Sequence, residues 1–186
     1  MKILKTDCLS DGFRMPGEFE KQDGCLMIYP WRPGSWNYNA KYARDVFVEI
    51  AHILGAYEDV YMIVRPEDMN EAITRLDHPH IHIIEASSDD AWARDTGPTF
   101  VINDKGERRG INWEFNAWGG SYDGLYSHWE NDQLIPNHLC KYLGDDLYEA
   151  RPFVLEGGSI HVDGEGTLIT TEECLLSPGR NPTMTR

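Results

Sequence analysis

The sequence predicts an α/β fold. Residues 25–84 alternate short apolar runs with helical patterns, in the order strand, helix, strand, short helix, strand. The 186 residues are 41% hydrophobic and include six tryptophans, which is enough apolar material for a packed core. No apolar run reaches the ~18 residues typical of a membrane span. These observations indicate a globular protein that does not reside in a membrane.

Five elements account for the first part of the chain. Residues 25–30 form an apolar run closed by a proline, as in a buried strand. From residue 39 to residue 56, apolar residues recur at spacings of three and four, which predicts an amphipathic helix ending near Gly55. Residues 59–64 predict a second strand, Pro66 opens a helix that runs to Leu76, and residues 80–84 predict a third strand.

The second part of the chain is richer in strands. Residues 99–102 and 111–115 flank a turn that contains a glycine, which predicts a hairpin. A helix is expected over residues 131–143, followed by a second hairpin that joins 159–162 to 167–171, and residues 172–176 begin another element. Because no Ser/Gly-rich linker separates these elements, we expect them to pack into one body.

The charge and cysteine content restrict the function. Seventeen basic against 31 acidic residues give a net charge of −14, which disfavours nucleic acid and anionic membranes and favours a small cationic substrate. Asp7 interrupts the N-terminal segment before a secretory apolar core develops. The four cysteines form no Cys-x-x-Cys pair and are too sparse for a disulfide framework. We therefore expect a cytoplasmic protein with reduced thiols.

The segment 156–163, EGGSIHVD, is the most specific chemical pattern. On a strand, His161 and Asp163 share a face, and the Gly-Gly pair permits close approach of a ligand or another backbone. Glu156, His161 and Asp163 would then converge, with His161 donating and accepting protons near neutral pH. The alternative is a hairpin with a solvated polar face.

Two tryptophan segments suggest a site for a planar cation. In residues 92–98, the Asp95 carboxylate can accept two parallel N–H bonds from a guanidinium while Trp92 offers its ring face. The alternative is an ordinary loop with a surface pair of Arg94 and Asp95. Trp118 beside Gly119 is a second candidate, although such a tryptophan is more often a core or lid residue.

Three histidines at spacing two, at positions 78, 80 and 82, raise the possibility of a metal site. No carboxylate or cysteine accompanies them at a familiar metal spacing, so we expect no metal. The sequence also lacks a phosphate-binding glycine loop and a serine nucleophile elbow. Nucleotide hydrolysis and esterase activity therefore have no support.

Linked motifs in residues 15–20, 92–98, 115–120, 156–164 and 180–182 together resemble the agmatine deiminases. These belong to the guanidino-modifying superfamily, which includes the peptidylarginine and arginine deiminases. The resemblance implies a pentein-type propeller of five α/β modules, of which residues 1–186 would form roughly the N-terminal half. It also implies a hydrolase of polyamine metabolism and putrescine biosynthesis. Such an enzyme converts agmatine and water to N-carbamoylputrescine and ammonia without a metal or organic cofactor.

The resemblance also assigns roles to the candidate residues. Asp95 and Asp163 would grip the guanidinium nitrogens, His161 would shuttle protons and Glu156 would orient the substrate. The substrate-binding wall would comprise Trp92, Trp118 and Gly119. A cysteine would attack the guanidinium carbon and form an amidino intermediate that water hydrolyses.

The sequence departs from the family pattern at the nucleophile. In the family this cysteine lies near the C-terminus, in a glycine-rich segment ending Ile-His-Cys, and none of the four cysteines here matches it. We expect a complementary C-terminal polypeptide to carry it, in a higher oligomer, and the chain alone to be inactive. A truncated product and a half-protein with another role remain alternatives. The competing function is a non-catalytic guanidinium or polyamine-binding module.

Overall fold

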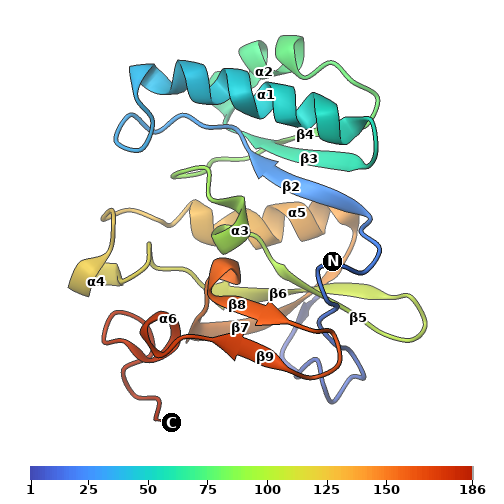
Figure 1. Ribbon diagram of the computed structural model, residues 1–186, viewed down its shortest axis with the longest axis vertical. Helices are drawn as coiled ribbons and strands as arrows, with labels where there is room; N and C mark the ends of the chain where they lie inside the picture. Colours follow the sequence, from blue (N-terminus) through green and yellow to red (C-terminus); the bar gives the residue numbers. More distant parts are fainter. Residues whose placement is uncertain (186) are drawn as a thin grey trace. The chain divides into compact units, whose positions relative to one another are not determined.

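The computed structural model describes residues 1–185 and confirms the mixed α/β architecture (Figure 1). The chain divides into two compact units. One unit is continuous and comprises Gln22–Ala93, and the other joins Met1–Lys21 to the residues from Arg94 onward. The expectation of one packed body stays a prediction. None of the helices in residues 1–185 is long and apolar enough to cross a membrane.

The continuous unit is a three-stranded parallel sheet with strand order β2-β3-β4. All five predicted elements are confirmed, with boundaries that differ from the predicted ones by at most three residues. They are β2 (Gly24–Ile28), α1 (Lys41–Gly55), β3 (Asp59–Val64), α2 (Met69–Arg75) and β4 (Ile81–Glu85). Single 3-10 turns at Tyr38–Ala40 and Pro66–Asp68 lead into the two helices.

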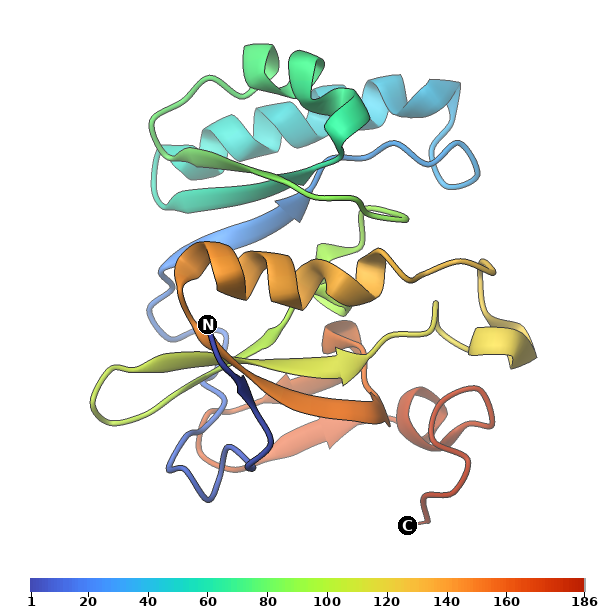
Figure 2. The ribbon, with the colours of Figure 1, turned by 180° about the vertical axis from the view of Figure 1, so that it is seen from behind.

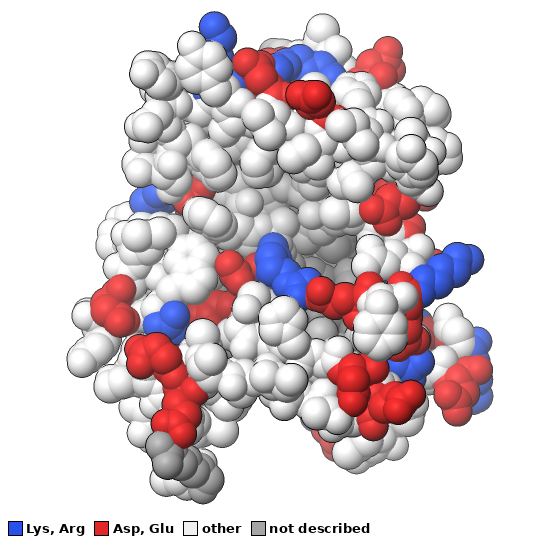
Figure 3. All heavy atoms as spheres, viewed as in Figure 1, with Lys and Arg blue, Asp and Glu red and all other residues white. Residues whose placement is uncertain are grey.

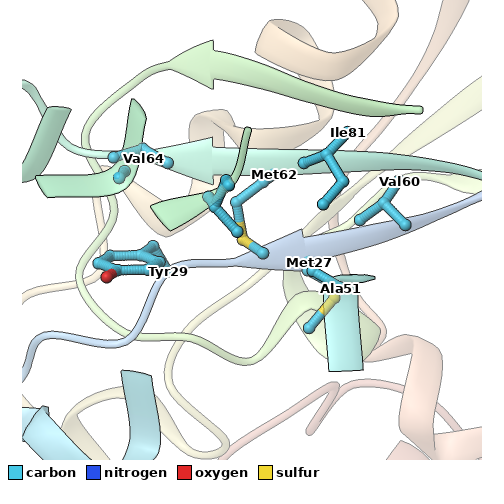
Figure 4. Close-up of a cluster of buried hydrophobic side chains, with 9 residues drawn as sticks. Met27, Tyr29, Ala51, Val60, Met62, Val64 and Ile81 are labelled. Carbon is cyan, nitrogen blue, oxygen red and sulfur yellow. The ribbon is translucent and has the colours of Figure 1, made fainter. Parts of the chain in front are cut away.

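Both helices cover the same face of this sheet (Figures 1 and 2). Alternate residues of β3, namely Val60, Met62 and Val64, point to that face and are at most 1% exposed. They pack with Ala51 of α1 and with the side chains of Met27, Tyr29, Ala72, Leu76 and Ile81 (Figure 4). This cluster is the core that the apolar runs of the sequence predict.

The second unit contains a four-stranded sheet with strand order β1-β7-β6-β5. Its strands are β1 (Ile3–Leu4), β5 (Thr99–Ile102), β6 (Arg108–Glu114) and β7 (Asp146–Val154). The antiparallel β5-β6 pair confirms the first predicted hairpin, and β6-β7 and β7-β1 are parallel. The helix expected over residues 131–143 is α5 (Ile135–Leu143), which packs on β6 and β7 after a 3-10 turn at Asp132–Leu134.

The second predicted hairpin is also confirmed, as an antiparallel pair of β8 (Ile160–Val162) and β9 (Leu168–Thr170). A 3-10 turn at Gly157–Ser159 precedes it, and α6 (Glu172–Leu176) follows. Two further short helices, α3 (Ala93–Thr96) and α4 (Gly120–Asp123), have no counterpart among the sequence predictions. Both follow directly on segments that contain candidate site residues.

Residues 14–20, which include the motif of residues 15–20, anchor the β8-β9 turn. Arg14 donates through Nη1 and Nη2 to the Glu20 carboxylate at 2.7 and 2.8 Å, and through Nη1 to the Gly164 carbonyl at 3.2 Å. The Gly17 N–H donates to Glu20 Oε1 at 2.8 Å. Glu18 forms an ion pair with Arg94 in α3. The motif therefore links two segments that are far apart in the sequence.

This anchor predicts a pH-dependent contribution to stability. The Arg14 guanidinium and the Gly17 N–H lower the pKa of Glu20 to about 2. Since this folded value lies below the ordinary value, Glu20 stabilises the fold above about pH 4.3 and loses that effect as the pH falls towards 2. Urea unfolding at several pH values should therefore show Glu20→Gln less stable than the parent at pH 7, with the gap closing in acid. The exposed Glu173→Gln serves as control, and a gap that stays constant down to pH 2 contradicts the assignment.

Candidate functional site

Three segments of the second unit meet around two carboxyl groups, Asp95 and Glu156. Asp95 lies in α3, and its Oδ1 accepts a hydrogen bond from the Gly158 N–H at 2.9 Å. The side chain of Trp118, from the loop after β6, donates a second hydrogen bond to Asp95. Glu156 lies between β7 and the 3-10 turn and is only 2% exposed. The structure thus places Asp95, Trp118 and Glu156 close together.

The Gly-Gly pair explains how the turn and α3 approach so closely. A Cβ atom at Gly158 would overlap the Asp95 carboxylate, and one at Gly157 would overlap the Arg94 carbonyl oxygen. Any other residue at either position would push the backbone away from α3. The two glycines therefore set the position of Asp95 relative to Glu156.

Arg180 completes the cluster and was not predicted as a site residue. Its Nε donates to Glu156 Oε1 at 3.0 Å, and its Nη1 lies 3.9 Å from Asp123 Oδ1 in α4. The side chain is 11% exposed. Asn181 fixes this segment, because its side-chain amide bonds to both the N–H and the carbonyl of Val154. The sequence motif of residues 180–182 contains Arg180, and the position of this residue between a glycine and an Asn-Pro pair was the local signal for it.

Burial dominates the electrostatics of the two acids. It raises the pKa of Asp95, against hydrogen bonds from Gly158 and Trp118. It also raises the pKa of Glu156, where Arg180 acts in the opposite direction and the charge of Asp95 adds to the increase. Arg94 acts on Asp95 as Arg180 acts on Glu156, yet the pKa of each acid remains raised, so the cations in the fold do not fully offset the cost of burying these carboxylates. An external cation could offset more of it. Figure 3 shows more acidic than basic side chains on the face that it presents.

The loop that supplies Trp118 has an unusual backbone. Ala117 and Trp118 both adopt left-handed conformations, with φ of 53° and 65°. Non-glycine residues hold this conformation only when their surroundings enforce it. Phe115 and Tyr126 contact the Trp118 ring edge-on at 5.2 and 5.9 Å, and Gly119 leaves no space for a Cβ beside Asp123. The loop therefore fixes the indole that bonds to Asp95.

The structure does not bring His161 and Asp163 into this cluster. His161 lies in β8, which ends at Val162, and Asp163 lies in the following turn. Asp163 Oδ1 accepts hydrogen bonds from the Glu165 and Thr167 N–H groups at 2.8 and 3.0 Å. Hydrogen bonds from Thr167 and Glu165 lower its pKa. Both His161 and Asp163 are exposed, so their predicted convergence with the buried Glu156 is not observed.

Trp92 belongs to the continuous unit, where its ring stacks on Trp36 at 6.0 Å. Its indole N–H donates to Asp90 Oδ2 at 2.9 Å. Asp90 is fully buried and also accepts from Trp36 and Ser35. Trp92 is thus held in place by a buried carboxylate while 38% of it remains exposed.

The histidine cluster has a partner that the sequence did not reveal. His80 Nδ1 and His82 Nε2 both lie within 3.0 Å of Asp59 Oδ1, across the β3-β4 pair. Within residues 1–185, no group of three or more His, Cys, Asp or Glu side chains is arranged to hold a metal ion. These histidines instead form hydrogen bonds at the edge of the sheet.

The cysteines lie outside the acidic cluster. Cys140 is buried in α5, and burial raises the pKa of its thiol to about 12. Burial also raises the pKa of Cys8 and Cys25. In the part of the chain that the structure describes, no hydrogen bond joins a cysteine to Asp95 or Glu156. A thiolate nucleophile is therefore not among the groups assembled around the two acids.

Comparison with known proteins gives the same family throughout. Residues 14–186 match the model of the Porphyromonas-type peptidyl-arginine deiminases. The chain is 50% identical over 186 residues to the agmatine deiminase of Pseudomonas syringae pathovar tomato, and the match covers 100% of this chain and 50% of that protein. The chain spans about half the length of the curated relatives it matches.

The structural comparison agrees. The solved agmatine deiminase of Enterococcus faecalis, described as catalysing its reaction, superposes with a TM-score of 0.96 at 45% sequence identity. The match covers 100% of this chain and 51% of that structure. The fold of residues 1–185 is therefore that of one half of such a protein.

Proposed function

The chain belongs to the Porphyromonas-type peptidyl-arginine deiminase family, and from this premise we propose that it supplies the guanidinium-binding half of an agmatine deiminase. The observation that carries the proposal is the pair of acids, Asp95 and Glu156, held together by the Gly157-Gly158 turn. The relatives named as agmatine deiminases support the substrate. In this proposal the whole enzyme is a propeller of five α/β modules, and modules outside residues 1–186 complete it.

The acid pair suits a guanidinium group. A planar guanidinium offers N–H donors in several directions, and two carboxylates from different segments can accept from different nitrogens. Arg180 occupies one oxygen of Glu156 and leaves the other oxygen for a ligand. Agmatine also carries an ammonium group, and the net charge of −14 attracts such a dication.

The proposed reaction is a two-step hydrolysis. A cysteine thiolate attacks the guanidinium carbon, and ammonia leaves after its nitrogen takes up a proton, which produces an amidino-thioether. Water then attacks the same carbon and expels the thiol, which yields N-carbamoylputrescine. Asp95 and Glu156 hold the group in line for attack, so the loss of association entropy precedes the chemical step.

We place the nucleophile outside residues 1–186, on a further segment or a second polypeptide. The inaccessible thiol of Cys140 and the absence of described contacts between a cysteine and the acid pair support this assignment. The roles of His161 in proton transfer, of Asp163 in gripping the substrate and of Trp92 and Gly119 in lining the pocket remain predictions from the resemblance. Their contacts described above add no support to the roles of His161 and Asp163.

Ammonia release tests the proposal. The purified 186-residue chain should release no ammonia from agmatine, because it lacks an accessible nucleophile beside the acids. Material purified with its complementary polypeptide, identified by intact mass, should release one ammonia per agmatine. Ammonia release by the verified single chain contradicts the location of the nucleophile. Agmatine binding without turnover by the two-chain material, measured by calorimetry, would instead identify a binding module.

A further inference from the structure

Asp90 is a buried carboxylate of the continuous unit that joins two indoles, and it is 0% exposed. Its Oδ1 accepts from the Trp36 indole N–H and from the Ala91 N–H, both at 2.9 Å. Its Oδ2 accepts from the Trp92 indole N–H at 2.9 Å and from the Ser35 hydroxyl. An ionised carboxylate offers about four acceptor positions, and these four donors match that number.

The loop before α1 is fixed against the segment that carries Asp90. The Trp31 indole N–H donates to the Ser88 carbonyl at 3.1 Å. Arg32 Nη1 donates to the Asp89 carbonyl at 3.2 Å. Two segments more than fifty residues apart in the sequence therefore form the surroundings of this carboxylate.

One face of the Trp92 ring is covered and the other is open. The Trp36 ring stacks on Trp92, with centroids 6.0 Å apart and an interplanar angle of 25°. Trp92 is nevertheless 38% exposed, so this exposure belongs to its edges and to the face opposite Trp36, termed its outer face. The indole is thus held at its N–H and along one face, while the outer face is accessible.

The charge of Asp90 acts on the Trp92 ring as well as on its orientation. A carboxylate draws the indole proton towards itself and leaves more electron density on the ring, because hydrogen-bonded groups polarise one another. The face of an aromatic ring already carries partial negative charge, so the polarised ring attracts a cation more strongly. A guanidinium suits such a face, because its planar group can stack on the ring.

We propose that Asp90 is a positioning residue of the substrate site that acts through Trp92: its carboxylate fixes the indole and strengthens the attraction of the outer face for a guanidinium. The inference rests on the proposed function, in which the guanidinium belongs to agmatine and Trp92 lines the site. The reaction converts this guanidinium to a neutral ureido group. The outer face therefore binds the substrate more tightly than the product, which favours product release.

Two-dimensional NMR of the indole N–H groups of the 186-residue chain tests the positioning. Asp90→Asn removes the charge and one acceptor oxygen, so it should shift the Trp92 signal. The signal of Trp113, whose indole donates to the neutral Thr99 hydroxyl at 3.0 Å, should stay in place. Asp132→Asn, at an equally buried acid of the other unit, is the matched control and should leave the Trp92 signal unchanged. A Trp92 signal that Asp90→Asn leaves in place overturns the proposal.

Titration of the same signals with ethylguanidinium and with its neutral analogue ethylurea tests the outer face. In the parent chain, the Trp92 signal should give a dissociation constant for ethylguanidinium about fivefold or more below that for ethylurea. Asp90→Asn should reduce this preference. The comparison of the two probes in the parent chain requires no variant to fold, and equal responses of Trp92, or none, overturn the proposal.

Agmatine separates the role of Asp90 from the proposed function. The Trp118 indole donates to Asp95 and reports on the acid pair, whereas the Trp92 indole reports on the outer face. A response of Trp118 alone overturns the role of Asp90 and leaves the acid pair in place. A response of Trp92 alone supports the attraction of its outer face and contradicts the acid pair.

Steady-state kinetics of the catalytically complete protein distinguish positioning from a purely structural role. Asp90→Asn should raise KM for agmatine about 3- to 30-fold, because substrate binding loses the polarised ring, and should leave kcat nearly unchanged. A merely structural defect lowers the active fraction of the protein. A fall in kcat at constant KM therefore overturns the proposal.

Discussion

Replacement of Asp95 by asparagine should lower kcat/KM for agmatine by roughly 30- to 1000-fold in the catalytically complete protein. The carboxylate is partly buried and held by Gly158 and Trp118, so its charge faces the bound cation with little screening by water. Loss of a charge-assisted bond to a desolvated cation costs about 2–4 kcal/mol. Asparagine keeps the size of the side chain, so the fold should remain intact by circular dichroism.

Asp163→Asn provides the sharpest comparison. The resemblance assigns Asp163 to the same guanidinium clamp, whereas its Oδ1 bonds to the backbone of the β8-β9 turn. Asparagine retains an acceptor there, so we expect kcat/KM within a few-fold of the parent, similar to the surface control Glu107→Gln. A loss as large as that of Asp95→Asn would restore Asp163 to the clamp. Near-parental kinetics in Asp95→Asn would remove Asp95 from it.

The second large effect concerns stability. Arg180→Met should destabilise the fold by about 3 kcal/mol at pH 7, because Glu156 is 2% exposed and would lose its cation. The pKa of Glu156 is already raised by burial and would rise further. Since the folded carboxyl then binds a proton more readily than the unfolded one, the deficit should shrink as the pH falls from 7 towards 5.

The double variant Arg180→Met/Glu156→Gln tests whether the loss of stability comes from the unpaired charge of Glu156. It carries no buried charge at this position, so most of the stability should return and the pH dependence of the deficit should disappear. Agmatine turnover should stay low, because Glu156 no longer holds the substrate. Urea unfolding of Arg180→Met, Glu156→Gln and the double variant at pH 5 and pH 7 measures the coupling. Additive losses in the double variant would show that the two side chains do not act as a pair.

The alternation of helices and strands could be predicted from the sequence wherever the apolar residues of an element follow a single spacing, that of a helix or that of a strand. The helix α1 and the strand β3 bury residues at spacings that their sequences display directly. Asp95, Glu156 and Trp118 could be singled out as candidates because glycines and aromatic residues lie near them in the sequence. In each case the signal lies within about ten residues of the feature that it predicts.

The features that the sequence did not predict depend on contacts between segments that are far apart in the sequence. Strand β7 carries Glu149, Arg151 and Pro152, which interrupt an apolar pattern, and the strand forms because β6 and β1 pair with it on both sides. Arg180 is buried only because it meets Glu156, 24 residues earlier. Asp163 fits the alternation of a strand, yet the turn ends that strand one residue before it. Local patterns contain no information on such partners.

The two units differ in how they can form during synthesis. All three strands of the continuous unit lie within sixty-two residues, Gly24–Glu85, so their pairing requires only neighbouring sequence. Strand β1 is synthesised well before its partner, because within residues 1–185 it pairs with β7, with Ile3 opposite Leu147. The residues of β1 must therefore remain unpaired until the roughly 140 residues that separate them from β7 have been translated. Among the strands within residues 1–185, β1 would therefore remain unpaired for the longest time and be the most persistent binding site for a chaperone of nascent chains.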